Sequence, residues 1–208
     1  MIATKRLRVW VGIMGMLLPI IVVVQSLAYG YNFPDSISET YYRDTCIVPF
    51  MIILGIASGL LMNYRGYTLL DDILNTVAGA CGLGVCLFPC IANAMPFIGT
   101  FRLPAGLSNT LHTISAVGFF GILAFNSLFQ FTKGSDNPTP NKKKRNIIYI
   151  VCGIGMILSF VALGIASAGL IKVPHIVWVI EAVALFFFGI SWLTKADCIP
   201  FLFADKKS

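Results

Sequence analysis

Charged residues are what this sequence has least of. Only 12% of its 208 residues are Asp, Glu, Lys or Arg, roughly half the share found in soluble domains. Hydrophobic residues make up 57% of the chain, and the mean hydropathy is +0.84. The composition therefore excludes a soluble domain and predicts an integral membrane protein.

Sequence motifs of known chemistry are also missing. The chain contains no G-x-S-x-G, no H-E-x-x-H and no glycine-rich phosphate loop. None of its six cysteines forms a C-x-x-C pair, which argues against a zinc or thiol redox motif. Cys46 and Cys90 are both expected near the outer face of the membrane, so whether they form a disulfide stays open. No motif therefore indicates a reaction class, and the candidate functional residues are isolated polar side chains.

Long apolar runs account for nearly the whole chain. A helix needs about 20 mostly apolar residues to cross the hydrocarbon core, and six runs approach or exceed that length. They cover residues 9–28, 46–62, 73–92, 110–131, 147–171 and 173–193. The first run resembles a secretory signal but is longer than a usual signal core, so we interpret it as an uncleaved helix. The predicted fold is all-α, a single domain over residues 1–208 made of six transmembrane helices. The segment from 132 to 146 is expected to be a polar connector.

The basic residues are distributed unevenly between the gaps. Of the 15 lysines and arginines, only Arg43, Arg102 and Lys172 fall in the first, third and fifth gaps. An excess of Lys and Arg in short loops marks the cytoplasmic side, so both termini are predicted to be cytoplasmic in a bacterial-type inner (plasma) membrane. No aromatic platform accompanies the basic run that ends at Arg145, so we expect membrane lipids as its partner and no nucleic acid.

Small residues recur at four-residue spacing, which lets helix backbones approach closely in lipid. Gly55 and Gly59 form a G-x-x-x-G in the second run, and Ala78, Gly82 and Cys86 form a similar stripe in the third. The favoured interpretation is packing within the bundle. A homo-oligomer formed through these faces is the alternative.

Ionisable residues inside membrane spans are functional candidates because they are costly to bury. Glu181 is the only acid well inside an apolar run, and His112 lies just inside the outer start of the fourth run. Asp44 lies beside Arg43 at the outer start of the second run, with Ser38 shortly before it. These five residues predict a polar pocket that opens outward.

Helical spacing refines this candidate set. Asn126 and Gln130 share one helical stripe with His112, and that stripe should face the interior of the bundle. His175 lies six residues before Glu181, about 120° away around the helix, so we expect it at the interface and not beside the acid.

The predicted pocket is compatible with several roles. It could be a structural network in which Arg43 or His112 neutralises Glu181. It could bind a lipid headgroup or a small ligand, which is the leading functional hypothesis. An enzyme alternative uses Asp44, His112 and Glu181 around a divalent metal, as a metal-assisted lipid hydrolase. A small proton- or cation-coupled transporter is disfavoured, because no internal repeat is evident.

Several short motifs resemble one membrane family. They are residues 36–38 with Arg43 and Asp44, residues 64–67 with the two aspartates 71 and 72, and residues 111–112. Residues 174–195, with Glu181 and a Gly-Ile-Ser-Trp stretch, complete the match. In these the chain resembles the bacterial six-helix proteins catalogued as domain of unknown function 998, related in layout to the Frag/DRAM/Sfk membrane family. The resemblance implies six helices, no established activity and a role connected with lipids. The chain departs from ceramidase-like membrane hydrolases, which have seven helices and several histidines.

Overall fold

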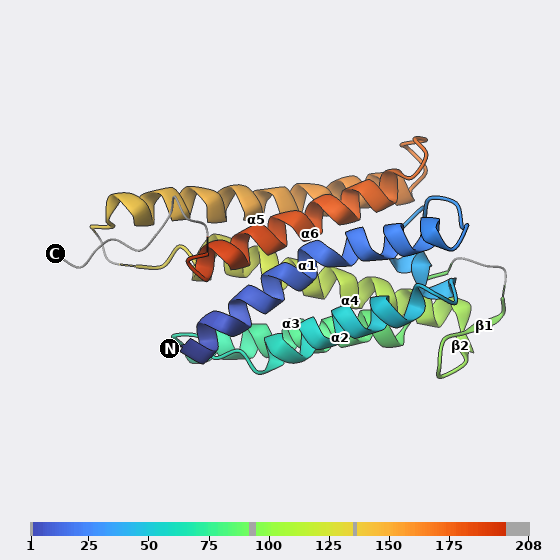
Figure 1. Ribbon diagram of the computed structural model, residues 1–208, viewed down its shortest axis with the longest axis horizontal. Helices are drawn as coiled ribbons and strands as arrows, with labels where there is room; N and C mark the ends of the chain where they lie inside the picture. Colours follow the sequence, from blue (N-terminus) through green and yellow to red (C-terminus); the bar gives the residue numbers. More distant parts are fainter. Residues whose placement is uncertain (1, 92–94, 135–136, 199–208) are drawn as a thin grey trace.

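The computed structural model describes residues 2–91, 95–134 and 137–198, and in these ranges six long helices run roughly parallel to one axis (Figure 1). The helices are α1 (Ile2–Ala28), α2 (Ile47–Met62), α3 (Leu69–Leu87), α4 (Ala105–Phe125), α5 (Pro140–Ser167) and α6 (Ile176–Lys195). Three short elements join them: a 3₁₀ helix η1 (Ser38–Tyr42), a two-stranded antiparallel hairpin of β1 (Phe97–Ile98) and β2 (Leu103–Pro104), and a π-helical segment η2 (Asn126–Gln130). The predicted all-α bundle of six helices is confirmed.

The lengths and surfaces of the helices are those of membrane spans. Five helices in the described ranges are long and apolar enough to cross a bilayer. The exception is α2, whose 16 residues extend about 24 Å against a hydrocarbon core of about 30 Å. The outer face of α5 is apolar, with Leu158 61% and Val161 55% exposed. By helix length and hydropathy, the chain is a multi-pass membrane protein.

The two ends of the bundle differ in the elements that lie there. We call the end where α1 begins and α6 finishes the base, and the opposite end, with η1 and the hairpin, the apex (Figure 1). The helix α6 packs against both α1 and α5, and α3 lies between α2 and α4. A Cβ at Gly189 of α6 would lie 2.8 Å from the carbonyl oxygen of Gly12 on α1, so only glycine allows this close approach. That the base faces the cytoplasm stays a prediction.

Local capping moves two helix boundaries away from the predicted ones. Thr68 and Asp71 form a capping box at the start of α3, which begins four residues earlier than expected because both free N–H groups are satisfied there. The helix α5 begins at Pro140, where the Thr139 side chain accepts from the Lys142 N–H at 3.3 Å. The expected connector from 132 to 146 was therefore wrong in its second half, because a threonine cap followed by proline starts a helix.

Only part of the small-residue pattern is used for packing within the chain. A Cβ at Gly82 would lie 2.2 Å from the Ser58 hydroxyl, so α2 and α3 meet there as predicted. Nothing lies within 4 Å of a Cβ at Gly55 or Gly59. The prediction that the G-x-x-x-G motif packs within the bundle was therefore wrong, because this face of α2 points away from the neighbouring helices. The homo-oligomer stays a prediction.

Candidate functional site

Glu181 lies one turn inside α6 and is bound by the loop that follows α1. Its Oε2 atom accepts the backbone N–H of Ile37 at 2.5 Å, and the Ser38 hydroxyl donates to Oε1 at 3.5 Å. Within the described ranges, no Lys, Arg or His lies within ion-pair distance of this carboxylate. The carboxylate is thus held by hydrogen bonds and not by the cation, Arg43 or His112, that the structural-network hypothesis invoked.

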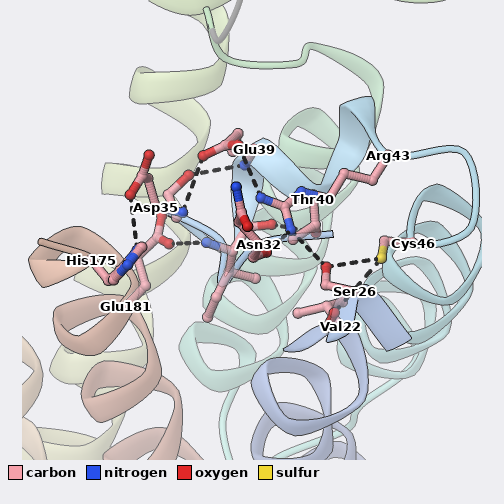
Figure 2. Close-up of polar contacts among 12 residues, drawn as sticks. Val22, Ser26, Asn32, Asp35, Glu39, Thr40, Arg43, Cys46, His175 and Glu181 are labelled. Carbon is pink, nitrogen blue, oxygen red and sulfur yellow. Dashed lines mark hydrogen bonds and ion pairs between the residues drawn. The ribbon is translucent and has the colours of Figure 1, made fainter. Parts of the chain in front are cut away.

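Arg43 holds the apical loops together instead. Its guanidinium donates to the Ser26 hydroxyl at 2.9 Å and to the Asn32 carbonyl at 2.7 Å, and it pairs with Glu39 at 3.3 Å (Figure 2). These contacts join α1, the loop after it and η1. The predicted neighbour Asp44 is exposed, so the structure does not bring it together with Glu181.

His112 fixes the segment in which α3 ends. Its Nδ1 atom lies 2.8 Å from the Phe88 carbonyl, which makes Nδ1 the protonated nitrogen because a carbonyl can only accept. Ser108 donates to the Pro89 carbonyl at 2.8 Å, and Tyr42 donates to the Cys90 carbonyl at 2.5 Å. Burial raises the pKa of Tyr42 to about 12, so it remains a donor. These side chains satisfy carbonyls beyond the helix end, as buried backbone groups require.

A cavity of about 520 Å³ lies between the apical halves of the helices, and we call it the apical cavity. Glu181, His112 and Ser38 all line it, whereas Asp44 and Arg43 do not. Most of its wall is apolar, from residues such as Leu54, Phe119, Phe120, Phe160, Leu163 and Leu185. The structure therefore brings three of the five predicted residues to one cavity.

The apical cavity opens between α4 and α5. Val117 on α4 and Gly164 on α5 line it, and both are exposed. Closer to the base α5 packs on the end of α4 and on η2, since a Cβ at Gly153 would lie 3.3 Å from the Ala124 carbonyl oxygen and 2.4 Å from the Leu128 side chain. The opening therefore lies on the lateral surface of two membrane-spanning helices, where lipid chains are the surrounding solvent.

Two further apical residues belong to the same region. His175 has a left-handed backbone, with φ of 58°, and its Nδ1 lies 2.9 Å from Asp35 Oδ1 (Figure 2). Among the described residues it forms no hydrogen bond or ion pair with Glu181. Its partner Asp35 lies two residues before Ile37, whose amide donates to Glu181. Cys90 lines the cavity, and burial together with the charge of Glu181 raises the pKa of its thiol to about 12. Cys46 and Cys90 are both free thiols.

The polar stripe of the fourth span continues below the cavity. Asn126 and Gln130 are buried, as predicted, and lie in the π-helical segment η2. The Asn126 side chain donates to Asn75 of α3 at 3.1 Å. Neither Asn126 nor Gln130 lines the apical cavity, so the described structure does not join them to it as a polar path.

The described part of the chain offers no arrangement for the metal-dependent alternative. In the described ranges no group of three or more His, Cys, Asp or Glu side chains is placed to hold a metal ion. Asp44, His112 and Glu181 therefore form no ligand set, and the divalent-metal hypothesis gains no geometric support.

Sequence reasoning missed the residues that position this site from outside the spans. Tyr42, Ser108 and Asn109 hold the segment 88–91, but isolated hydroxyl and amide residues at span ends are too common to single out. The Ile37 amide is a backbone group and has no sequence signal.

The fold and this cavity define the chain as a multi-pass membrane protein with a laterally open cavity at one end. No family model, no curated protein and no solved structure matches the chain. Membership of the domain of unknown function 998 family therefore stays a prediction.

Proposed function

We propose that this protein binds an amphipathic ligand, a lipid with a hydrogen-bond-donating or cationic headgroup, in the apical cavity. The observation that carries the proposal is one largely apolar cavity of about 520 Å³ that holds a carboxylate, Glu181, without a cationic partner in the described ranges. Ligand pockets of this size, apolar with a few polar groups, are typical of small-molecule sites.

The headgroup chemistry follows from the polar residues. Glu181 is an acceptor with capacity beyond its two hydrogen bonds, because an ionised carboxylate has about four lone-pair sites. A hydrogen bond in which the acceptor is ionised is about twice as strong as a neutral one. An ammonium headgroup would supply the missing donors, and His112 at the cavity wall offers its second ring nitrogen.

The entry route follows from the lateral opening. A ligand whose acyl chain lies in the bilayer reaches the cavity between α4 and α5 without leaving the membrane, since Val117 and Gly164 border both. The charge distribution supports an outward-facing apex, so the lipid would come from the outer leaflet. The lipid-related role implied by the family resemblance agrees with this proposal.

The test compares two exposed glycines of the spans. Gly164 lines the cavity and Gly121 does not, and a Cβ at either position meets nothing within 4 Å. The full-length protein in a neutral detergent is titrated with lysophosphatidylethanolamine or with lysophosphatidylglycerol of the same chain length, and the thermal unfolding midpoint is followed. A ligand that binds only the folded state raises that midpoint saturably.

We expect the ethanolamine lipid to stabilise the natural protein and Gly121→Leu equally. Gly164→Leu should lose at least about tenfold in affinity because leucine fills the cavity mouth, and Glu181→Gln should lose about tenfold through the lost charge-assisted bond. Equal affinity of Gly164→Leu and Gly121→Leu, or no saturable shift with either lipid, would contradict the proposal. A Glu181→Gln variant that loses the same affinity for both lipids would contradict the headgroup assignment.

A further inference from the structure

A second pocket, at the base of the bundle, has the opposite chemistry. Its volume is about 430 Å³, and the start of α1, the loop between α2 and α3, and the end of α6 line it. Four of its side chains are cationic and one is acidic; the residues are Lys5, Arg8, Arg65, Lys195 and Asp197, with Tyr67 beside them. We call it the basal pocket.

The charges of the basal pocket are only partly balanced within the protein. Asp197 lies 3.8 Å from Arg145, and Arg65 lies 3.8 Å from Asp72 outside the pocket. Both distances are long for an ion pair with a hydrogen bond. The pocket thus keeps an excess of positive charge at one place where three chain segments meet.

Lys195 differs from the exposed cations of the pocket because its side chain is half-buried. It is the last residue of α6, and its Nζ lies 5.3 Å from the Tyr67 ring and 5.1 Å from the Phe131 ring. No hydrogen-bond acceptor for Nζ occurs among the described residues. A partly desolvated ammonium that lies against two ring faces and makes no hydrogen bond among the described residues retains three donors for a ligand.

Arg8 provides a rigid wall next to this ammonium. Its Nε and Nη2 atoms donate to the Tyr64 hydroxyl at 3.2 and 3.0 Å, and Nη1 donates to the Lys195 carbonyl at 3.3 Å. Three of its five N–H groups are thereby engaged, so the guanidinium is held in place before any ligand arrives. Preorganised cations of this kind favour binding because little side-chain entropy is lost.

From this geometry we propose that the basal pocket binds a phosphate-bearing anion, supplied by an anionic lipid headgroup or by a soluble phosphate. Arg and Lys are the residues that recognise phosphate, Arg by paired N–H groups and Lys as a point charge. Basic pockets between transmembrane helices on the cytoplasmic side bind anionic headgroups, and the predicted orientation puts the base on that side. This site is separate from the apical cavity and does not depend on the function proposed for it.

The test uses charge-matched double variants. Lys5→Gln with Arg65→Gln removes two exposed cations that line the pocket, and Lys143→Gln with Lys144→Gln removes two exposed cations at the same end that do not. A third variant, Lys195→Met, keeps an unbranched side chain that is one atom shorter and removes the charge. Each full-length protein in neutral detergent is titrated with dioctanoyl phosphatidylglycerol, dioctanoyl phosphatidylcholine or inorganic phosphate at fixed salt, and the unfolding midpoint is measured.

We expect a saturable rise with phosphatidylglycerol or with phosphate in the natural protein and in the Lys143/Lys144 control. The Lys5/Arg65 variant should lose about thirtyfold in affinity, since each cation near an anionic surface contributes about fivefold. Lys195→Met should lose at least about tenfold. A response to the lipid alone assigns the source as a headgroup, and a response to phosphate alone assigns it as a soluble ion.

Two results would overturn the basal site. One is an equal loss in the Lys5/Arg65 variant and in the Lys143/Lys144 control, which would mean diffuse attraction to surface charge. The other is the absence of a saturable shift with either anion. If Lys195→Met unfolds on purification, the comparison of the Lys5/Arg65 variant with the Lys143/Lys144 control still tests the basal site.

Discussion

At the scale of single residues, the environment of a side chain decides its chemistry more than its type does. Glu181 and Asp44 are both carboxylates near the apex, yet Glu181 lines a cavity and accepts a buried amide while Asp44 is exposed. The difference arises because the loop before η1 folds back over α6 and covers one acid only. Of these two acids, only Glu181 therefore lines the apical cavity.

The thiol of Cys90 provides a prediction at this scale. Its pKa is raised to about 12 by burial and by the nearby Glu181 charge, so at pH 8 it holds about a thousandfold less thiolate than an ordinary cysteine. Because the thiolate is the nucleophile, alkylation by N-ethylmaleimide should be at least a hundredfold slower at Cys90 than at exposed Cys198. The rate at Cys90 should rise about tenfold per pH unit through the alkaline range.

Peptide mass spectrometry after timed labelling of the folded protein measures both rates. Labelling after denaturation controls for intrinsic accessibility, since both thiols should then react alike. Similar rates at Cys90 and Cys198 in the folded state would show that Cys90 is neither buried nor beside an acid.

At the scale of elements, the distribution of glycine shows which helix faces are shared within the chain. The α1–α6 and α2–α3 contacts depend on glycines that allow backbones to approach, whereas Gly55 and Gly59 of α2 face away from the bundle. A G-x-x-x-G motif by itself therefore did not identify the packed face of α2. The packed face of α2 instead carries the buried Ala57 and Ser58, and Ser58 lies against Gly82 of α3.

Gly79 and Gly59 make a matched pair that tests this packing. A Cβ at Gly79 would lie 2.5 Å from the Ser58 carbonyl oxygen and 3.0 Å from the Met62 nitrogen, and backbone atoms cannot move aside cheaply. Gly79→Ala should cost about 1–3 kcal/mol in unfolding free energy, whereas Gly59→Ala should be neutral or stabilise by up to about 1 kcal/mol. Unfolding in detergent by increasing denaturant measures both, and equal midpoints would mean that α2 and α3 pack differently.

At the scale of the whole molecule, the bundle separates two kinds of pocket. The apical cavity is mostly apolar with one buried acid, and the basal pocket is cationic. The two lie at opposite ends of the same helices, since α6 contributes Glu181 near its start and Lys195 at its end. Which ligand each pocket meets depends on the orientation of the protein in the membrane.

The orientation itself can be measured with two exposed lysines. Lys172 lies in the turn between α5 and α6 at the apex, and Lys144 lies in the first turns of α5 at the base. In a chain whose Cys198 is replaced by Ser, we expect Lys172→Cys to react with a membrane-impermeant maleimide in intact cells. Lys144→Cys should react only after permeabilisation, because the positive charges hold the base inside. The reverse pattern would place the apical cavity in the cytoplasmic leaflet.

The sequence alone was sufficient for properties that depend on near neighbours in the chain. Run length predicted six helices, and the 3.6-residue period predicted that His112, Asn126 and Gln130 would be buried on one stripe. Both properties follow from the geometry of a single helix in an apolar solvent. The prediction was less successful at helix ends, where caps such as Thr139 and Pro140 override hydropathy.

The candidate site was decided by the tertiary structure. Three of the predicted residues share a cavity because α4, α6 and η1, which are distant in the sequence, each contribute one of them, and that arrangement depends on how the helices pack over their whole length. The shorter of the two hydrogen bonds to Glu181 comes from the amide of Ile37, a group that every residue except proline carries, and the longer one comes from the predicted Ser38. No sequence pattern can mark one backbone amide among many, so only the fold determines which of them meets the buried acid.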